Sequence, residues 1–330
     1  MHMTDRVPLE RRHVVACALL GVALTAQAGP LSLAISQSVT HDSNFSKNAA
    51  SESETISQTN LQLKLDKAYG RQNYTAAARY GLARFARFGD QLNGTNYDLS
   101  GGFSTGLAAN WQVDLNGSAS QYLNPNQNNP ETQRVVKNEV KENNVNLNIR
   151  YGVAGRLASV VSFGTGKLDY SLPSQHYKNR KQDTTGFRVI YATSDLLNFG
   201  IGISAAESEY PDYIIGGRPE KVSQRSLDLS SNWQVTGFSS FNGVLSLTHN
   251  RYRSDSDAKF NGVTGRLNWN FTPRGHISYA LQLARTTDSD STQTSSRVTG
   301  TDGLLDTALN TITTSLNGSA RWKPTAKLAF

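Results

Sequence analysis

The chain has little of what several common protein classes need. Its 330 residues contain one cysteine, so an intramolecular disulfide bond is excluded, and that cysteine lies in a predicted signal peptide, so the mature chain is expected to hold no thiolate metal site. Hydrophobic residues make up only 37% of the chain, and the mean hydropathy is −0.46. No segment after residue 28 approaches about 18 consecutive apolar residues, which excludes a membrane protein built from helices. Asn, Ser, Thr, Gly and Gln are abundant instead, in a composition that suits a β-barrel with a polar lumen.

The N-terminus carries the features of a secretory signal peptide. Arg6, Arg11 and Arg12 form a basic region, residues 14–26 form an apolar segment, and residues 26–28 read Ala-Gln-Ala, which is typical of a cleavage site. We therefore expect residues 1–28 to be removed after Ala28 and residues 29–330 to form the mature protein. The single cysteine, Cys17, lies inside the signal peptide.

Alternating apolar and polar residues recur along the chain and predict β-strands, because every second side chain of a strand faces the same way. The alternation is interrupted by tight turns near residues 69, 108, 154, 194, 237, 273 and 324. Longer polar connections lie between them, at residues 124–133, 172–181, 209–221, 253–258 and 286–305. Short turns at one rim and long loops at the other are typical of outer-membrane barrels.

The predicted fold is therefore all-β, a transmembrane antiparallel up-and-down β-barrel of the bacterial outer membrane, with the tight turns in the periplasm. The chain holds about fourteen strands of roughly ten membrane-spanning residues each. Pro324 follows Trp322 as Pro273 follows Phe271, and this similarity indicates a turn rather than a closing strand. We expect the chain to be a C-terminally truncated barrel that in its complete form has about 14 to 18 strands, a number typical of such barrels. The alternative is a complete barrel of about fourteen strands with a short tail.

Strand parity assigns side chains to the two faces of the sheet. The charged residues predicted to face the lumen, as candidate solute contacts, are Lys64, Arg79, Arg150, Arg188, Arg266, Arg321, Asp66, Asp98, Asp114 and Asp228. Aromatic residues gather beside the tight turns, where an interfacial girdle belongs. They are Trp111, Tyr151, Tyr191, Phe199, Trp233, Phe241, Trp269, Phe271 and Trp322.

The basic side chains support a hypothesis about the solute. Lys64, Arg150, Arg266 and Arg321 lie close to predicted periplasmic turns, so they are candidates for a basic band at that mouth. Rings of Arg and Lys favour anions in pores, and guanidinium groups bind carboxylates in a bidentate way. The alternative is that these side chains pair with aspartates and only keep the lumen solvated.

The sequence offers no catalytic constellation. The histidines after residue 28 are His41, His176, His249 and His276, and none forms a metal-binding pair or a recognisable spacing with serine. We predict neither enzymatic activity nor a metal or other cofactor. The positive charge, +7 for the whole chain, is spread over many strands and forms no nucleic-acid patch.

The chain resembles the EpsL-type β-barrel porins, outer-membrane proteins from exopolysaccharide operons of Gram-negative bacteria. The resemblance rests on a signal peptide followed at once by a strand ending at His41-Asp42-Ser43-Asn44-Phe45, and on the aromatic-Pro turns near Pro273 and Pro324. It covers residue 29 to the end and implies a part in polysaccharide transport across the outer membrane.

Three functions follow as expectations: a pore for exopolysaccharide export, a general or anion-selective diffusion porin, or a structural and assembly partner of a polysaccharide export machine. The expected partners are the lipid bilayer and lipopolysaccharide, polysaccharide or small anionic solutes, and the outer-membrane assembly machinery. Nucleic acid is not among them, and we expect a monomer.

Overall fold

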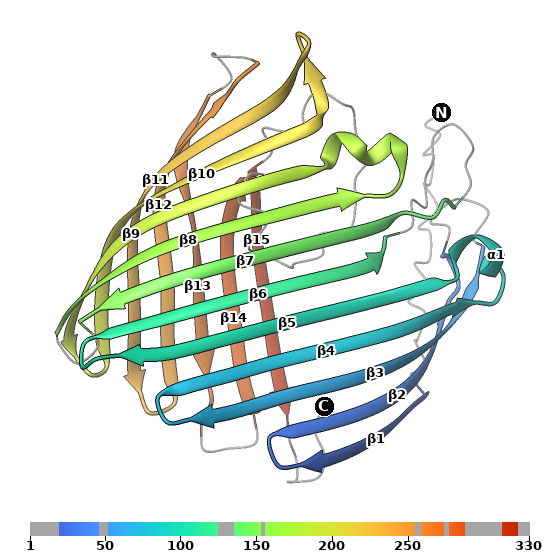
Figure 1. Cartoon of the computed structure of the whole chain (residues 1–330), viewed down its shortest axis with the longest axis horizontal. Helices are drawn as coiled ribbons and strands as arrows, with labels where there is room; N and C mark the ends of the chain where they lie inside the picture. Colours follow the sequence, from blue (N-terminus) through green and yellow to red (C-terminus); the bar gives the residue numbers. More distant parts are fainter. Residues whose placement is uncertain are drawn as a thin grey trace, which may run out of the picture. The chain divides into compact units, whose positions relative to one another are not determined.

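A computed structural model describes residues 20–45, 52–124, 135–152, 156–254, 259–273, 277–287 and 312–322. Within them, fifteen strands form one sheet in which each strand pairs with its neighbours in chain order (Figure 1). The strands are β1 Leu20–Ala28, β2 Leu31–Asp42, β3 Glu54–Tyr69, β4 Gln72–Phe85, β5 Gly94–Leu107, β6 Trp111–Leu123, β7 Glu139–Tyr151, β8 Leu157–Tyr170, β9 Arg180–Ser194, β10 Leu197–Ile215, β11 Arg218–Thr236, β12 Ser239–Tyr252, β13 Lys259–Phe271, β14 Ile277–Thr287 and β15 Ile312–Trp322. The predicted fold class, all-β with antiparallel up-and-down strands in one sheet, is confirmed.

The predicted tight turns are confirmed wherever the structure describes their flanks. Strand ends meet across short connections at Tyr69/Gln72, Leu107/Trp111, Tyr151/Leu157, Ser194/Leu197, Thr236/Ser239 and Phe271/Ile277. The turn expected near Pro324 lies outside the described residues. Strand β1 falls within the segment predicted to be the signal peptide, and β2 to β15 follow it.

Two of the longer connections contain short helices, α1 (Gly89–Leu92) and the 3₁₀ helix η1 (Pro173–Lys178). The loop predicted at residues 209–221 is wrong. There β10 and β11 continue as a paired hairpin to Ile215 and Arg218, and Gly216 and Gly217 form the turn with φ of +59° and +78°. Glycine adopts such angles without strain, so the two glycines allow the strands to reverse in two residues.

The tip of this hairpin has its own apolar contacts, because Tyr210, Val222 and Tyr252 bury their side chains against each other. The prediction of a loop failed because the alternating pattern breaks here, whereas the backbone pairing resumes at Ile214 after a register shift that follows Tyr210. The described helices include none that is long and apolar enough to span a membrane.

The described residues group into two compact units. The smaller contains the described residues up to Lys64 together with Ala78–Asp98 and Gln121–Glu139. The larger contains Leu65–Ala77, Leu99–Ser120 and the described residues from Val140 onward.

In the larger unit, the two faces of the sheet show a burial pattern that is the reverse of a soluble protein's. Ile201, Leu229 and Leu245 are direct cross-strand partners, and they are 54%, 51% and 52% exposed. Their neighbours in sequence on the opposite face include Asp228, which is only 7% exposed. We call these the apolar face and the polar face. Soluble proteins bury such aliphatic side chains, so a continuous exposed set indicates a non-aqueous or protein contact.

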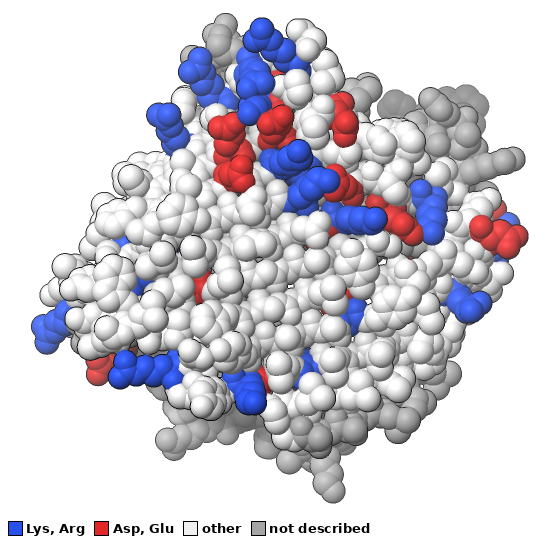
Figure 2. Space-filling model, in the orientation of Figure 1, with Lys and Arg blue, Asp and Glu red and all other residues white. Residues whose placement is uncertain are grey.

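The apolar face carries no charged side chain over a band of about ten residues along the strands. In β8, residues 157–166 contain no charged side chain, and in β11 the only one among residues 226–236 is Asp228 on the polar face. Ten strand residues rise about 34 Å, or about 24 Å along the membrane normal at a tilt of 45°. The lipid-facing band of known barrels is about 25 Å tall. Figure 2 shows most charged side chains gathered toward strand ends, with an area between them that carries few charges.

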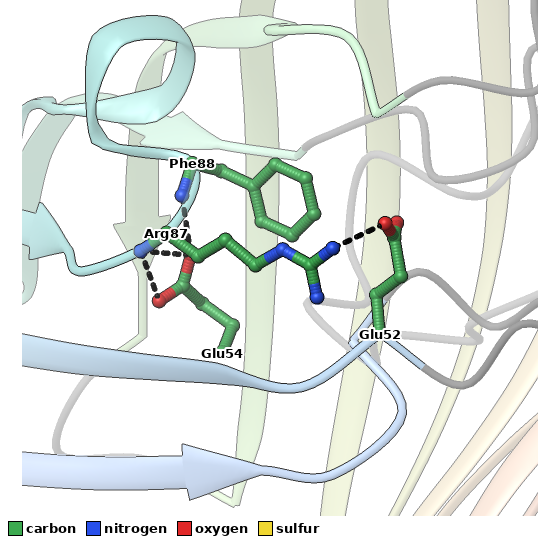
Figure 3. A network of polar contacts seen from close by, with 4 residues as sticks. All are labelled: Glu52, Glu54, Arg87 and Phe88. Atoms are coloured by element: carbon green, nitrogen blue, oxygen red, sulfur yellow. Dashed lines mark hydrogen bonds and ion pairs between the residues drawn. The ribbon is translucent and has the colours of Figure 1, made fainter.

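In the smaller unit, a buried carboxylate holds the segment that follows β4. Glu54, 1% exposed, accepts the backbone N–H groups of Arg87 and Phe88 at 2.8–3.2 Å (Figure 3). It also accepts those of Ala86 at 2.9 Å and Thr55 at 2.7 Å. Burial raises the pKa of Glu54, but these backbone donors, led by Phe88, outweigh burial and leave the pKa below its usual value. The clamp fixes the entry to α1.

Next to the clamp, Leu92 of α1 packs with Phe45, Phe85 and Val135 in a small apolar core. The clamp and this core therefore define one end of the smaller unit.

Candidate functional site

The register of the larger unit places two predicted pore arginines and one aspartate in one row across the polar face. Arg150 of β7 is the partner of Val160 in β8, which is the partner of Arg188 in β9. Arg188 is the partner of Gly202 in β10, which in turn pairs with Asp228 in β11. Residues two strands apart are separated by about 10 Å. We call this set the arginine row.

Small residues make room for the arginine in the middle of the row. A Cβ atom on Gly202 would lie 3.1 Å from the Cβ of Arg188, and one on Gly200 would lie 3.1 Å from its Cδ. The aliphatic part of the Arg188 side chain therefore runs over two glycines of β10. Larger residues at these positions would displace it.

The arginines of the row are not neutralised by the described part of the chain. The Nε atoms of Arg150 and Arg188 are buried and have no hydrogen-bond partner there. Neither side chain forms an ion pair with a described residue. Buried donors are normally satisfied, so these two positions are suited to an anionic or hydrogen-bonding solute, or to water.

Asp228 is held by hydroxyl groups rather than by arginine. It accepts hydrogen bonds from Ser204 Oγ at 2.8 Å and Ser246 Oγ at 2.6 Å. Beside it, Thr248 Oγ1 lies 3.1 Å from Ser226 Oγ and 2.7 Å from Thr264 Oγ1. Neighbouring strands β10 to β13 are therefore linked by a hydroxyl network on their polar face.

The other predicted contacts of the larger unit lie apart from the arginine row. Arg266 pairs with Val244 and Ala284 and lies one polar-face position nearer the tight turns than the row that contains Asp228. Arg321 pairs with Ser278 and lies nearer to the tight turns than Arg266 does. Asp114 accepts hydrogen bonds from Ser104 Oγ at 2.5 Å and Gln112 Nε2 at 3.0 Å. Asp66, on β3, is exposed.

Three of the predicted charged residues belong to the smaller unit. Arg79 donates to Asn60 Oδ1 from Nε at 3.3 Å and from Nη2 at 3.2 Å, whereas Lys64 and Asp98 are exposed. The structure therefore brings together Arg150 and Arg188, which the basic-band hypothesis had not grouped, and leaves Lys64 in another unit.

The predicted girdle aromatics lie on the apolar face beside the tight turns. Ring centroids are 6.2 Å apart for Trp233–Phe241 and for Phe241–Trp269, and 5.9 Å apart for Trp269–Phe271. Trp269 Nε1 donates to Ser239 Oγ at 3.0 Å. An aromatic body with a satisfied polar handle is what a membrane–water interface favours.

The remaining girdle residues follow the same placement. Trp111 contacts Tyr151 with centroids 4.9 Å apart, and Tyr191 is the cross-strand partner of Phe199. Trp322 ends β15 and is 52% exposed.

A row of carboxamides, which the sequence analysis missed, lies beside this girdle on the opposite, polar face. Its members are cross-strand partners on six adjacent strands, β10 to β15: Asn198, Asn232, Asn242, Asn268, Gln282 and Asn317. We call it the amide row. Four of its members directly adjoin a girdle aromatic in sequence, and this adjacency is the signal that would have revealed it.

Hydrogen bonds connect most neighbours in the amide row. Asn232 Nδ2 donates to Asn198 Oδ1 at 3.1 Å, and Asn242 Nδ2 donates to Asn232 Oδ1. Gln282 Nε2 donates to Asn268 Oδ1 at 2.9 Å, and Asn317 Nδ2 lies 3.5 Å from Gln282 Oε1.

Comparison with known proteins gives no family for the chain. No family model matches it, and no curated protein matches it. Among solved structures it is similar to the copper transporter OprC, with a TM-score of 0.44 and 9% identity over 94% of this chain and 59% of that one. It is also similar to the siderophore receptor PirA from Pseudomonas aeruginosa, with a TM-score of 0.41 and 12% identity over 79% of this chain and 44% of that one.

A third similar structure is the ferric yersiniabactin uptake receptor FyuA from Yersinia pestis, with a TM-score of 0.36 and 10% identity over 94% of this chain and 71% of that one. The chain spans less than two thirds of the length of OprC and of PirA.

Proposed function

We propose that this chain is an outer-membrane β-barrel pore whose apolar face contacts lipid and whose polar face lines a passage for solute. The observation that carries the proposal is the reversed burial of the larger unit, with exposed Ile201, Leu229 and Leu245 opposite a nearly buried Asp228. The interior strands of an up-and-down sheet satisfy their backbone groups through their neighbours, and closure of the sheet into a barrel satisfies the edges, which is a condition for spanning a membrane. In this proposal lipid and lipopolysaccharide surround a monomer that the outer-membrane assembly machinery inserts.

The arginine row supports an anionic solute. Arg150 and Arg188 carry positive charge that no described carboxylate neutralises, and planar guanidinium groups suit carboxylates. Together with the resemblance to EpsL-type porins, this favours the passage of an acidic exopolysaccharide. An anion-selective diffusion porin is the second candidate, because the same two arginines would favour any small anion.

Ion selectivity in planar lipid bilayers tests the pore and its charge. The purified full-length protein is expected to form channels, and the double variant Arg150→Glu with Arg188→Glu is expected to shift the reversal potential in a KCl gradient toward cation preference. Arg225→Glu is the matched control, since Arg225 is exposed and is the partner of Ala205 and His249 on the apolar face. Absence of channels would contradict the pore, and an unchanged reversal potential in the double variant would contradict the role of the arginine row.

Polymer secretion separates the two candidate cargoes. A deletion strain of the source bacterium is expected to lose surface polysaccharide and to regain it with the native chain. Growth on small anionic nutrients should change little. Normal polymer secretion together with impaired uptake of small anions would favour the diffusion porin instead.

A further inference from the structure

The amide row has chemistry that the arginine row lacks. Six uncharged side chains, each with both donor and acceptor atoms, lie on adjacent strands and extend over about 24 Å at the usual strand spacing. A wall that only needed solvation would be served by any mixture of polar residues. Here one chemical group recurs at one level of the sheet, on β10 to β15.

The hydrogen bonds inside the row leave binding capacity unused. A carboxamide has two N–H donors and an acceptor oxygen with two lone pairs. Each link between Asn198 and Asn232, or between Asn232 and Asn242, uses one donor and one lone pair. The second N–H and the second lone pair of such a group stay available, and Asn232, Asn242 and Asn317 are exposed on the polar face.

The same hydrogen bonds orient the groups. An amide held by its neighbour has lost much of its rotational freedom before a ligand arrives, which lowers the entropic cost of binding. Hydrogen bonds between exposed side chains contribute little to folding stability, so stability alone does not explain an ordered row at this position.

We propose that the amide row is a binding strip for the hydroxyl groups of a carbohydrate chain, whose acidic groups the arginine row favours. The proposal rests on the pore function and names the chemistry of its cargo. Hydroxyl groups both donate and accept hydrogen bonds, which matches the carboxamide inventory, whereas a small inorganic anion would use only the donors. The girdle aromatics face the other side of the sheet, so the strip binds through polar contacts and not through stacking.

Two measurements with maltohexaose, a neutral oligosaccharide, test the strip. Calorimetry of the full-length protein in detergent is expected to show binding, and addition of the sugar to planar bilayers is expected to reduce channel current in a concentration-dependent way. The double variant Asn232→Ala with Asn242→Ala should weaken both by about tenfold, the amount expected for the loss of a few solvent-exposed hydrogen bonds. Its reversal potential in a KCl gradient should not change.

Asn148→Ala is the matched control, because Asn148 is an amide of the polar face on β7, outside the row. This variant should bind the sugar, and its channel current should be reduced by the sugar, as in the native chain. Channels that conduct but neither bind nor are blocked by the sugar would overturn the strip and leave the pore standing. Equal weakening by Asn148→Ala and by the double variant would also overturn it. Sugar binding that depends on the row in a protein that forms no channels would support the strip and overturn the pore.

Discussion

The clamp at Glu54 yields a quantitative prediction about local stability. Replacing Glu54 by Ala removes the acceptor for the N–H groups of Thr55, Arg87 and Phe88, while Ala86 keeps a bond to Thr55 O at 3.1 Å. Each bond to a charged acceptor contributes about 1.5–3 kcal/mol, and exposed donors regain part of this from water. The free energy of local opening of this segment should therefore fall by about 3 kcal/mol, which corresponds to about a hundredfold faster exchange of the freed amide hydrogens.

Hydrogen–deuterium exchange read by mass spectrometry measures this effect on peptides that cover residues 85–93. The control is Glu52→Gln, which breaks the 2.8 Å ion pair with Arg87. Those side chains are 30% and 54% exposed, and surface pairs contribute about 0–1 kcal/mol, so exchange should change severalfold at most. Equal acceleration by both variants, or none by Glu54→Ala, would refute the account of the clamp.

The direction of the Glu54 pKa adds a pH dependence. A carboxylate whose pKa is lower in the folded state stabilises that state fully above its unfolded pKa of about 4.3. The stabilisation is lost as the pH falls through the lowered value. In the native chain the protection of residues 85–93 should therefore fall in acid. In Glu54→Ala it should be low and independent of pH over that window.

Three further predictions concern the larger unit. Asp228→Ala should lower the free energy of unfolding in lipid or detergent by about 3 kcal/mol, measured by urea titration, because two hydroxyl bonds to a charged acceptor are lost; a change below about 0.5 kcal/mol would contradict the contacts. Gly202→Ala should destabilise by about 1–3 kcal/mol, since its Cβ would lie 2.7 Å from Phe187 O, whereas Gly101→Ala, with open space around it, should not. Hydrogen bonds from Lys221 to Glu207, and secondly to Glu209, raise the pKa of Lys221. Lys221→Met should therefore weaken the β10–β11 hairpin by less than about 1 kcal/mol below about pH 10, and this difference from the native chain should vanish as the pH rises through the raised pKa.

The fold was predictable because its signals are local. A period-2 pattern that ends in a short turn specifies a hairpin within some thirty residues, and the turns near Tyr69, Asp195 and Gly237 were found in this way. The paired extension to Gly216 and Gly217 was missed because hydrophobic alternation stops there, whereas strand pairing resumes at Ile214 after an irregularity. The short helix α1 was missed because four residues leave no periodic trace.

The candidate site was less predictable because it depends on register between strands. Parity within one strand suggested the face on which Arg150 or Arg188 lies, but only the pairing through Val160 places them in one row. The amide row was missed for the same reason, since its members are separated by 10 to 35 positions along the chain and become neighbours only in the sheet.

The reversed burial of the two faces also constrains when the protein can fold relative to its insertion into a membrane. A sheet that leaves Ile203, Leu247 and Leu316 62%, 56% and 67% exposed gains little from the hydrophobic effect by forming in water. In the proposed pore, lipid covers that face, so the folded state gains its stability as the sheet enters the membrane, and folding and insertion are coupled. Because each strand pairs with its neighbour in sequence, the barrel can then grow one hairpin at a time from whichever hairpin reaches the bilayer first.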